Sequence, residues 1–231
     1  MVRISALVRE DKILTLSREA RTVNAKSAKP PSGFGEGVCD HGVLMGLGQT
    51  LSIALKEWDT VCRALGDGRQ IILLRKGGIF EDAGQFELEH REFLLFPTFV
   101  HQTLAGLKPE AHAGFSPVNE EPAVVRISGA GVVTDILQIE SRAQMDAIEA
   151  EHVWASPLID MRFSYKPEKP LYLLLVRAYR LEPVSIQNTR AYAGCKSWVP
   201  LKEAIDTGEA KTVLDEGGYG EKRKRILRGI G

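Results

Sequence analysis

The stretch IILLRKGGIFEDAGQFELEHREFLLFPTFVHQ, residues 71–102, places polar side chains at the ends of two apolar runs. The runs cover about residues 70–76 and 86–96, are rich in Ile, Leu and Phe, and Pro97 closes the second. Short apolar runs bounded by turn residues are typical of buried strands, so we predict two strands here. A pair of glycines follows the first run, and their tolerance of positive φ allows a sharp turn.

Helices are predicted at about residues 50–66 and 141–152. In the first, apolar residues recur at three- and four-residue spacing, and Gly66 stands at the expected stop. In the second, Ser141 and Gln144 form a capping-box pattern, because the hydroxyl and the amide can satisfy N–H groups of the first turn. The apolar face of the first helix consists of Ala54, Leu55, Trp58, Val61, Cys62 and Leu65.

The remaining pattern predicts more strands than helices. The segment at 106–122 contains several prolines and glycines and is predicted to form a long exposed loop. Strands and helices do not alternate regularly, so we expect an α+β fold with a mixed or antiparallel sheet, packed by a few helices in a single main domain. The further strands are expected at about 123–128 and 131–139, with a bend or hairpin at Gly129 and Gly131, at 158–164 and 171–181, and in a short element at 198–201.

The chain divides into three regions by composition. Residues 1–46 form an arm that contains a Pro/Gly-rich linker, and residues 47–205 carry the regular patterns of the core domain. Residues 206–231 are expected to form a charged tail, in which 221–225 is a solvated, frayed end.

The composition of the 231 residues is that of a globular protein with balanced charge. Thirty basic and thirty acidic residues cancel, which excludes a uniformly cationic nucleic-acid binder and requires any such binding to come from a local patch. Three separated cysteines argue against a disulfide framework and against structural zinc. The sequence predicts no membrane span and no signal peptide, so a cytoplasmic location is expected.

Several motifs of the core resemble one protein family. They are LKEW at 55–58, LLRKGGI at 73–79, HREFLLFPT at 90–98 followed by His101 and Gln102, and GCKSWV at 194–199. Over about residues 50–202 the chain resembles the bacterial family called domain of unknown function 1802. The family has no established activity. Its suggested association with restriction-modification systems implies that a protein resembling it works in the presence of nucleic acid.

One candidate site is catalytic. His90 and Glu92 share a face of the expected strand, and with His101 they could supply a general base and an orienting carboxylate, provided that folding brings them together. In the alternative interpretation, Glu92 joins a cross-strand ion pair and the histidines are ordinary surface residues. Convergence of both polar strand ends in one pocket is the condition for the enzyme hypothesis.

The second candidate site is a basic and aromatic surface. Within residues 160–202, eight Lys and Arg residues stand against three acids, interleaved with aromatic rings that could stack on bases. In the alternative interpretation, the rings fill the core and the cations lie on half-exposed strands. The candidate binding residues are Arg75, Lys76, Gly77, Gly78, Gln102, Arg162, Arg177 and Lys196.

No cofactor or metal is predicted. The glycine-rich stretches complete no dinucleotide or phosphate-loop motif, and no histidine pair has zinc-ligand spacing. Glu87-Leu88-Glu89 lacks the lysine expected of a divalent-metal nuclease. Cys195 beside Lys196 has the character of a nucleophile, but a small residue at this place is more often a packing element.

Three functions remain open. The first is a nucleic-acid-associated accessory protein that contacts DNA or RNA through the basic candidate residues. The second is a hydrolase-type enzyme that uses His90, Glu92 and His101. The third is a structural, partner-binding module that needs no catalytic site.

Overall fold

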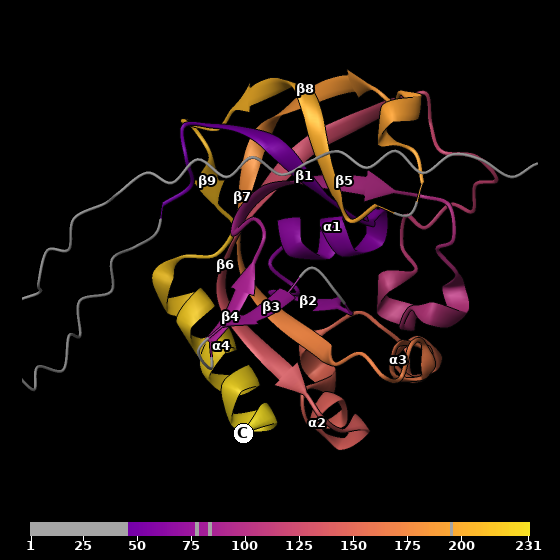
Figure 1. Ribbon diagram of the computed structural model, residues 1–231, viewed down its shortest axis with the longest axis vertical. Helices are drawn as coiled ribbons and strands as arrows, with labels where there is room; N and C mark the ends of the chain where they lie inside the picture. Colours follow the sequence, from indigo (N-terminus) through magenta and orange to yellow (C-terminus); the bar gives the residue numbers. More distant parts are fainter. Residues whose placement is uncertain (1–45, 77–78, 83–84, 195) are drawn as a thin grey trace, which may run out of the picture. The chain divides into compact units, whose positions relative to one another are not determined.

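A curled mixed sheet of seven strands forms the centre of the described part of the chain (Figure 1). The computed structural model describes residues 46–231 except 77–78, 83–84 and 195. The strand order is β2-β7-β6-β5-β1-β8, and β9 pairs with β7. Only the β1–β5 pair is parallel among the described strands, so the expected α+β fold with a mixed sheet is confirmed.

The described elements follow one another along the chain with two long strands in the middle. A separate hairpin, β3 with β4, lies outside the main sheet. The elements are β1 (Thr50–Trp58), α1 (Asp59–Gly66), β2 (Ile72–Arg75), β3 (Ile79–Asp82), β4 (Gln85–Leu88), β5 (Glu92–Thr98), β6 (Val124–Ile139), α2 (Arg142–Ala147), α3 (Ser156–Ser164), β7 (Leu171–Gln187), β8 (Trp198–Asp206), β9 (Lys211–Thr212) and α4 (Glu216–Ile230).

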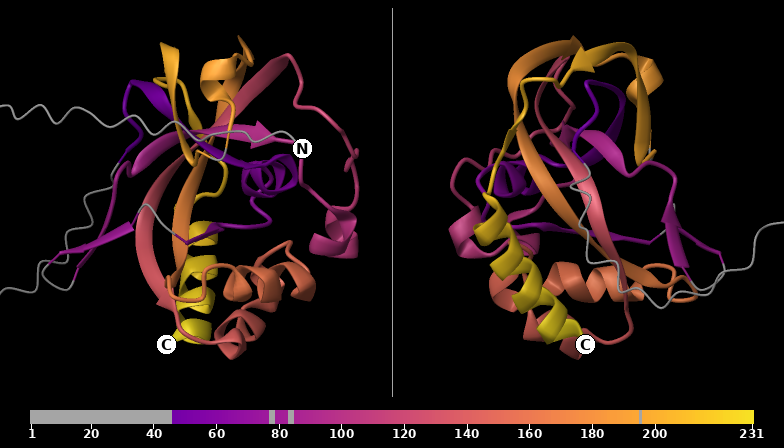
Figure 2. Two further views of the ribbon diagram at one scale, coloured as in Figure 1. Left: turned by 45° about the vertical axis from the view of Figure 1, so that its right-hand side comes forward. Right: turned by 90° about the vertical axis from the view of Figure 1, so that its left-hand side faces the viewer.

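The sheet buries side chains on both faces because successive strand residues point to opposite sides. Leu55 and Phe93 belong to the larger apolar cluster, which the helices cover, whereas Ala54 and Leu94 belong to a smaller cluster enclosed by the curled upper strands. In Figure 1 and both views of Figure 2, α2, α3 and α4 lie at the lower part of the long strands, and β8 arches over the upper part.

The predicted helix at 50–66 is wrong in its first half. Residues Thr50–Trp58 form β1, and only Asp59–Gly66 are helical. The segment contains two overlapping periods: Leu51, Ile53 and Leu55 alternate as in a strand, and the helical spacing holds only from residue 58 onward. The parallel partner β5 stabilises the strand, which local spacing does not reveal.

Two other predictions need correction. The bend expected between 123–128 and 131–139 does not separate two strands, because β6 runs continuously and shifts register between Ile127 and Gly129. At Gly131 a Cβ would lie 2.6 Å from a methyl carbon of Val176 and 3.1 Å from the ring of Phe93, so glycine serves close packing. The strand predicted at 158–164 is the helix α3, which begins with proline in its first turn.

Other elements agree with the sequence or extend beyond it. Ser141 and Gln144 form the predicted capping box, although the helix that follows ends at Ala147. The strand expected at 171–181 extends to Gln187, and the short element at Trp198 extends to Asp206. The strand predicted at 86–96 is divided into β4 and β5.

The C-terminal residues form a helix instead of the solvated, frayed end expected at 221–225. In α4, Tyr219 and Ile226 are buried in the core. Arg223 donates two hydrogen bonds to Asp135 of β6, at 2.9 and 2.5 Å. These contacts fix α4 on the sheet.

Among the described residues, no helix is both long and apolar enough to span a bilayer.

Candidate functional site

A buried ion pair joins the ends of β1 and β2. Arg75 Nη1 lies 2.9 Å from Glu57 Oε2, and both side chains are almost fully buried. Nη2 of the same arginine donates to the carbonyl of Lys56 at 3.3 Å. Thr98 of β5 donates to the Glu57 carbonyl at 3.0 Å, which fixes this end of β1 against its parallel neighbour.

Helix α3 places a second guanidinium, that of Arg162, within the electrostatic influence of Glu57 and Arg75. Burial lowers the pKa of Arg162, the charge of Glu57 raises it, and the nearby Arg75 lowers it again. An arginine remains protonated despite such a shift, so Arg162 is a fixed cation here. Lys76 binds the end of α3, because its Nζ donates to the carbonyls of Phe163 and Lys166 at 3.1 Å each.

Lys56 adds a cation on the other face of β1. Its Nζ donates to the carbonyl oxygens of Tyr192 and Gly194. The same ammonium lies 5.9 Å from the centre of the Phe96 ring. The loop that precedes β8 is therefore drawn to β1, and the backbone N–H of Lys56 donates to Ser197 at 2.8 Å.

We call Lys56, Arg75, Lys76 and Arg162 the cationic cluster. Among Arg75, Lys76 and Arg162, Glu57 neutralises one positive charge, which leaves a local charge of about +2 by count (3 − 1). The contacts of Lys76 described above are to carbonyl oxygens, which carry no net charge. Uncompensated cations that are partly withdrawn from water create a positive potential and attract anions.

Exposed side chains extend the cluster on two sides. Lys166 follows α3 and lies 5.2 Å above the ring of Tyr165, which is 52% exposed. Lys196 is exposed and immediately precedes Ser197, whose carbonyl accepts a hydrogen bond from the backbone N–H of Lys56. Trp198, at the start of β8, is partly buried and faces Leu55 across the strand pair. Rings and cations are thus combined at this end of the sheet.

The proposed catalytic residues do not converge. His90 and His101 lie beyond opposite ends of β5, whose seven residues span roughly 20 Å. His90 packs edge-on against Trp198, with a centroid distance of 5.2 Å. His101 is exposed in a turn with φ of 74°, and Glu92 accepts a hydrogen bond from Gly48 N at 2.8 Å. The expectation of one pocket shared by His90 and His101 is therefore wrong.

The predicted binding residues are partly brought together. Arg75, Lys76 and Arg162 meet in the cationic cluster, and Lys196 adjoins it. Arg177 lies elsewhere: it donates to both carboxylate oxygens of Glu216 at 2.6 and 2.7 Å. Gln102 is buried and accepts from Thr60 N and Oγ1 at 3.0 Å each, at the start of α1. The remaining candidates, Gly77, Gly78 and Cys195, lie outside the described residues.

Lys56 of the cationic cluster and Glu57, which pairs with Arg75, were not among the sequence-based candidates. Lys56 and Glu57 stand in the segment read as helix, where they would share the polar side with other charges. As neighbours in a strand they point to opposite faces, one toward Phe96 and one toward Arg75. The available signal was a charged pair at the end of an apolar alternation, Leu51, Ile53 and Leu55.

A metal site has no support in the described part of the chain. No group of three or more His, Cys, Asp or Glu side chains lies close enough there to hold a metal ion. The side chains of Glu81, Asp82 and Glu87 lie outside this description.

Comparison with solved structures finds similar chains of low identity. The crystal structure of ASCH from Zymomonas mobilis has 10% identity, covers 76% of this chain and 93% of that chain, and has a TM-score of 0.36. A mutant of the same protein has 12% identity, covers 65% of this chain and 90% of its own, and has a TM-score of 0.39. Comparison with curated proteins finds no match.

Comparison with family models finds a match over most of the core. The matching model is "Domain of unknown function (DUF1802)", and it aligns with residues 54–225. This range begins within β1 and ends within α4, so it includes all four residues of the cationic cluster and the first part of the C-terminal helix. The chain therefore belongs to the DUF1802 family.

Proposed function

We propose that this protein is a nucleic-acid-associated accessory protein whose cationic cluster contacts the phosphate backbone of a single strand. The observation that carries the proposal is the convergence of Arg75, Lys76 and Arg162 at the ends of β2 and α3, with Lys56 on the opposite face of the adjoining strand β1. These residues are separated by up to 106 positions in sequence (162 − 56), so the fold alone concentrates their charge.

The neighbouring rings favour a single strand over a duplex. Tyr165 exposes about half of its surface and carries the Lys166 ammonium above one face. An exposed ring beside a cationic track can stack on an unpaired base, whereas the bases of a duplex are already stacked on each other. Proteins that bind single strands without strong sequence preference combine these two features.

An accessory role suits the arrangement better than catalysis by the predicted triad. His90, Glu92 and His101 are distributed along β5 and beyond both of its ends, so they do not act together on one bond. The family resemblance implies a link to restriction-modification. In such a system this protein would bind a single strand of nucleic acid while a separate enzyme carries out the reaction.

The test is a salt-dependent binding titration with a fluorescently labelled single-stranded RNA or DNA. Counterion release predicts that affinity falls with salt, with a log–log slope of about −2 to −3 for three or four phosphate contacts. Arg162→Gln and Lys196→Gln should each weaken binding and make the slope shallower by about 0.7. Lys211→Gln is the matched control, because Lys211 is exposed and pairs with Arg180, eight residues along β7 from the partner of Arg75.

The outcomes separate clearly. Loss of binding in Arg162→Gln and Lys196→Gln with retention in the control supports the cluster and its exposed extension as the interface. Absence of binding at low ionic strength, or equal weakening by Lys211→Gln, contradicts the proposal.

A further inference from the structure

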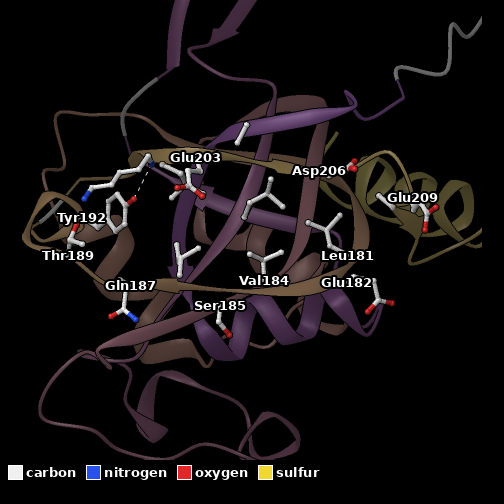
Figure 3. Close-up of a pocket in the computed structure, with 16 residues that line it drawn as sticks. Leu181, Glu182, Val184, Ser185, Gln187, Thr189, Tyr192, Glu203, Asp206 and Glu209 are labelled. Atoms are coloured by element: carbon white, nitrogen blue, oxygen red, sulfur yellow. Dashed lines mark hydrogen bonds between the residues drawn. The ribbon is translucent and has the colours of Figure 1, made fainter.

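A groove of about 640 Å³ lies between the C-terminal half of β7 and β8 (Figure 3), and its lining includes Tyr192, whose carbonyl accepts a hydrogen bond from Lys56. Its apolar lining includes Leu181, Val184, Leu201 and Ile205. Val184 is 38% exposed although it stands in a strand, and Leu181 lies beside it along the groove. This volume is within the range of sites that bind ligands or short chain segments.

The two strands that border the groove present unpaired edges to it. On one side β7 pairs with β6 through Gln187, but on the other side its described partners β2 and β9 reach no farther than Arg180. β8 pairs with β1, and within the described residues no strand pairs with its opposite edge. An unpaired edge offers N–H and C=O groups to an incoming extended chain.

Acidic side chains surround the groove. Glu182, Asp206 and Glu209 lie at one end in Figure 3, and Glu203 projects from β8. Lys202 is the one basic residue of the lining, so the count gives a charge of −3 (1 − 4). None of these four acids forms an ion pair with a residue of the described part of the chain.

We propose that this groove binds an extended basic segment of a partner protein, with its apolar side chains on Leu181, Val184 and Leu201 and its Lys or Arg residues at the acidic rim. Alternation of apolar and cationic residues suits an extended chain, because successive side chains point to opposite sides. The same negative charge repels a phosphate backbone, so nucleic acid is excluded from this groove.

A second copy of the chain suits the groove less well. Pro183 and Pro200 stand in the two bordering strands, and each lacks the N–H needed for edge-to-edge pairing of identical strands. Two copies would also bring like charges from two acidic rims together. A basic partner can form ion pairs with the acidic rim. It can also bond to those backbone groups of the strand edges that are not prolines, and pack on the apolar lining.

The probe is a labelled peptide of about seven residues that alternates Lys with Val or Ile, the length of the β7 segment 181–187. Anisotropy titration of the full chain should show binding that weakens as salt rises. The control peptide has Glu in place of each Lys and should not bind. Conversion of all four acids to amides (Glu182→Gln, Glu203→Gln, Asp206→Asn and Glu209→Gln) should weaken binding about tenfold, since each exposed ion pair contributes about twofold in affinity.

Two further variants make the test specific to the groove. Ala204→Trp places a large ring in the groove lining and should abolish peptide binding, whereas the exposed loop variant Glu120→Gln should bind as the original chain does. An excess of single-stranded nucleic acid should not displace the peptide, because none of Arg75, Lys76 and Arg162 lines the groove.

The contrary results are equally definite. Failure of the peptide to bind at any ionic strength, or equal binding of the Glu-containing peptide, overturns the proposal. Sedimentation that shows self-association, abolished by Ala204→Trp, assigns the groove to a second copy instead.

Discussion

Arg75 and Glu57 form an ion pair of 2.9 Å between β2 and β1, two strands that β7, β6 and β5 separate in the sheet. The two side chains meet because the sheet curls until β2, at one edge, approaches the end of β1. The same pair anchors the cationic cluster, since Glu57 also lies close to Arg162. One carboxylate thus closes the curled sheet and leaves an excess of positive charge beside it.

The first prediction concerns the stability contributed by this pair. Arg75→Met should lower the free energy of unfolding by about 3 kcal/mol, because removal of one partner leaves a buried charge uncompensated. Arg162 remains near Glu57, so the loss should lie at the lower end of the range for buried pairs. Urea unfolding of the two proteins measures the difference.

A double-mutant cycle provides the control for Arg75. In the background of Glu57→Gln, Arg75→Met should cost much less, since the charge to be compensated is absent. A coupling energy below about 0.5 kcal/mol would show that the two side chains contribute independently.

The second prediction concerns close packing at Gly131. Gly131→Ala should destabilise the protein by about 1–3 kcal/mol, because its Cβ would meet Val176 at 2.6 Å and the Phe93 ring at 3.1 Å. Gly220→Ala is the matched control: nothing lies within 4 Å of the added carbon in α4, and alanine is the better helix former. Thermal unfolding should give opposite shifts, and equal shifts would contradict the packing argument.

The sequence predicted the fold class because local patterns agree with it in most elements. The capping box at Ser141 and the apolar run before Arg75 identify a helix and a strand without any tertiary information. At residues 50–58 local spacing suits both a helix and a strand, and only the distant strands β5 and β8 decide between them. Gly131 is interpreted as a bend for the same reason, because the sequence around it does not reveal its contacts with the distant residues Val176 and Phe93.

The site was predictable in its residue types but not in its assembly. Arg75, Lys76 and Arg162 were identified as cations after apolar runs or within a basic segment, and they do meet. Arg177 belonged to the same basic segment, but its guanidinium forms a bidentate ion pair with Glu216 of α4. No local feature predicts which arginine finds a carboxylate 39 residues away.

The third prediction separates these two arginines. Arg177→Gln should destabilise the protein by about 2 kcal/mol, because it removes a bidentate pair and a contact 4.5 Å from the centre of the Tyr219 ring. It should leave nucleic-acid affinity unchanged, whereas Arg162→Gln should weaken binding. Comparable loss of affinity in both variants would argue that the two arginines share one interface.

The fourth prediction is a pH dependence of stability from His152. Burial and the nearby charge of Lys108 lower the pKa of His152 from 6.5 to about 4. The unfolded chain therefore takes up a proton near pH 6.5 while the folded protein does not, so stability is full above pH 6.5 and falls as the pH decreases to about 4. The difference between the two pKa values corresponds to about 3 kcal/mol.

His152→Gln tests this origin of the acid sensitivity. The variant should show a much flatter stability profile between pH 6.5 and 4 in urea unfolding. Below that window both chains should lose stability, because the arginine pairs of Asp135 and Glu151 outweigh burial and lower the pKa of each carboxyl. An unaltered slope between pH 6.5 and 4 would assign the effect to other groups.

The last prediction concerns base stacking on Tyr165. The ring is 52% exposed and has the Lys166 ammonium 5.2 Å from its centre, so truncation removes contact surface without opening the core. Tyr165→Ala should weaken single-strand binding roughly five- to a hundredfold, since stacking on an aromatic side chain contributes about 1–3 kcal/mol per base. Tyr165→Phe keeps the ring face and should bind normally, and Val118→Ala serves as a control for an exposed apolar residue elsewhere. If Tyr165→Ala binds as tightly as the original chain while keeping its melting temperature, the interface is purely electrostatic and the preference for unpaired bases is lost from the proposal.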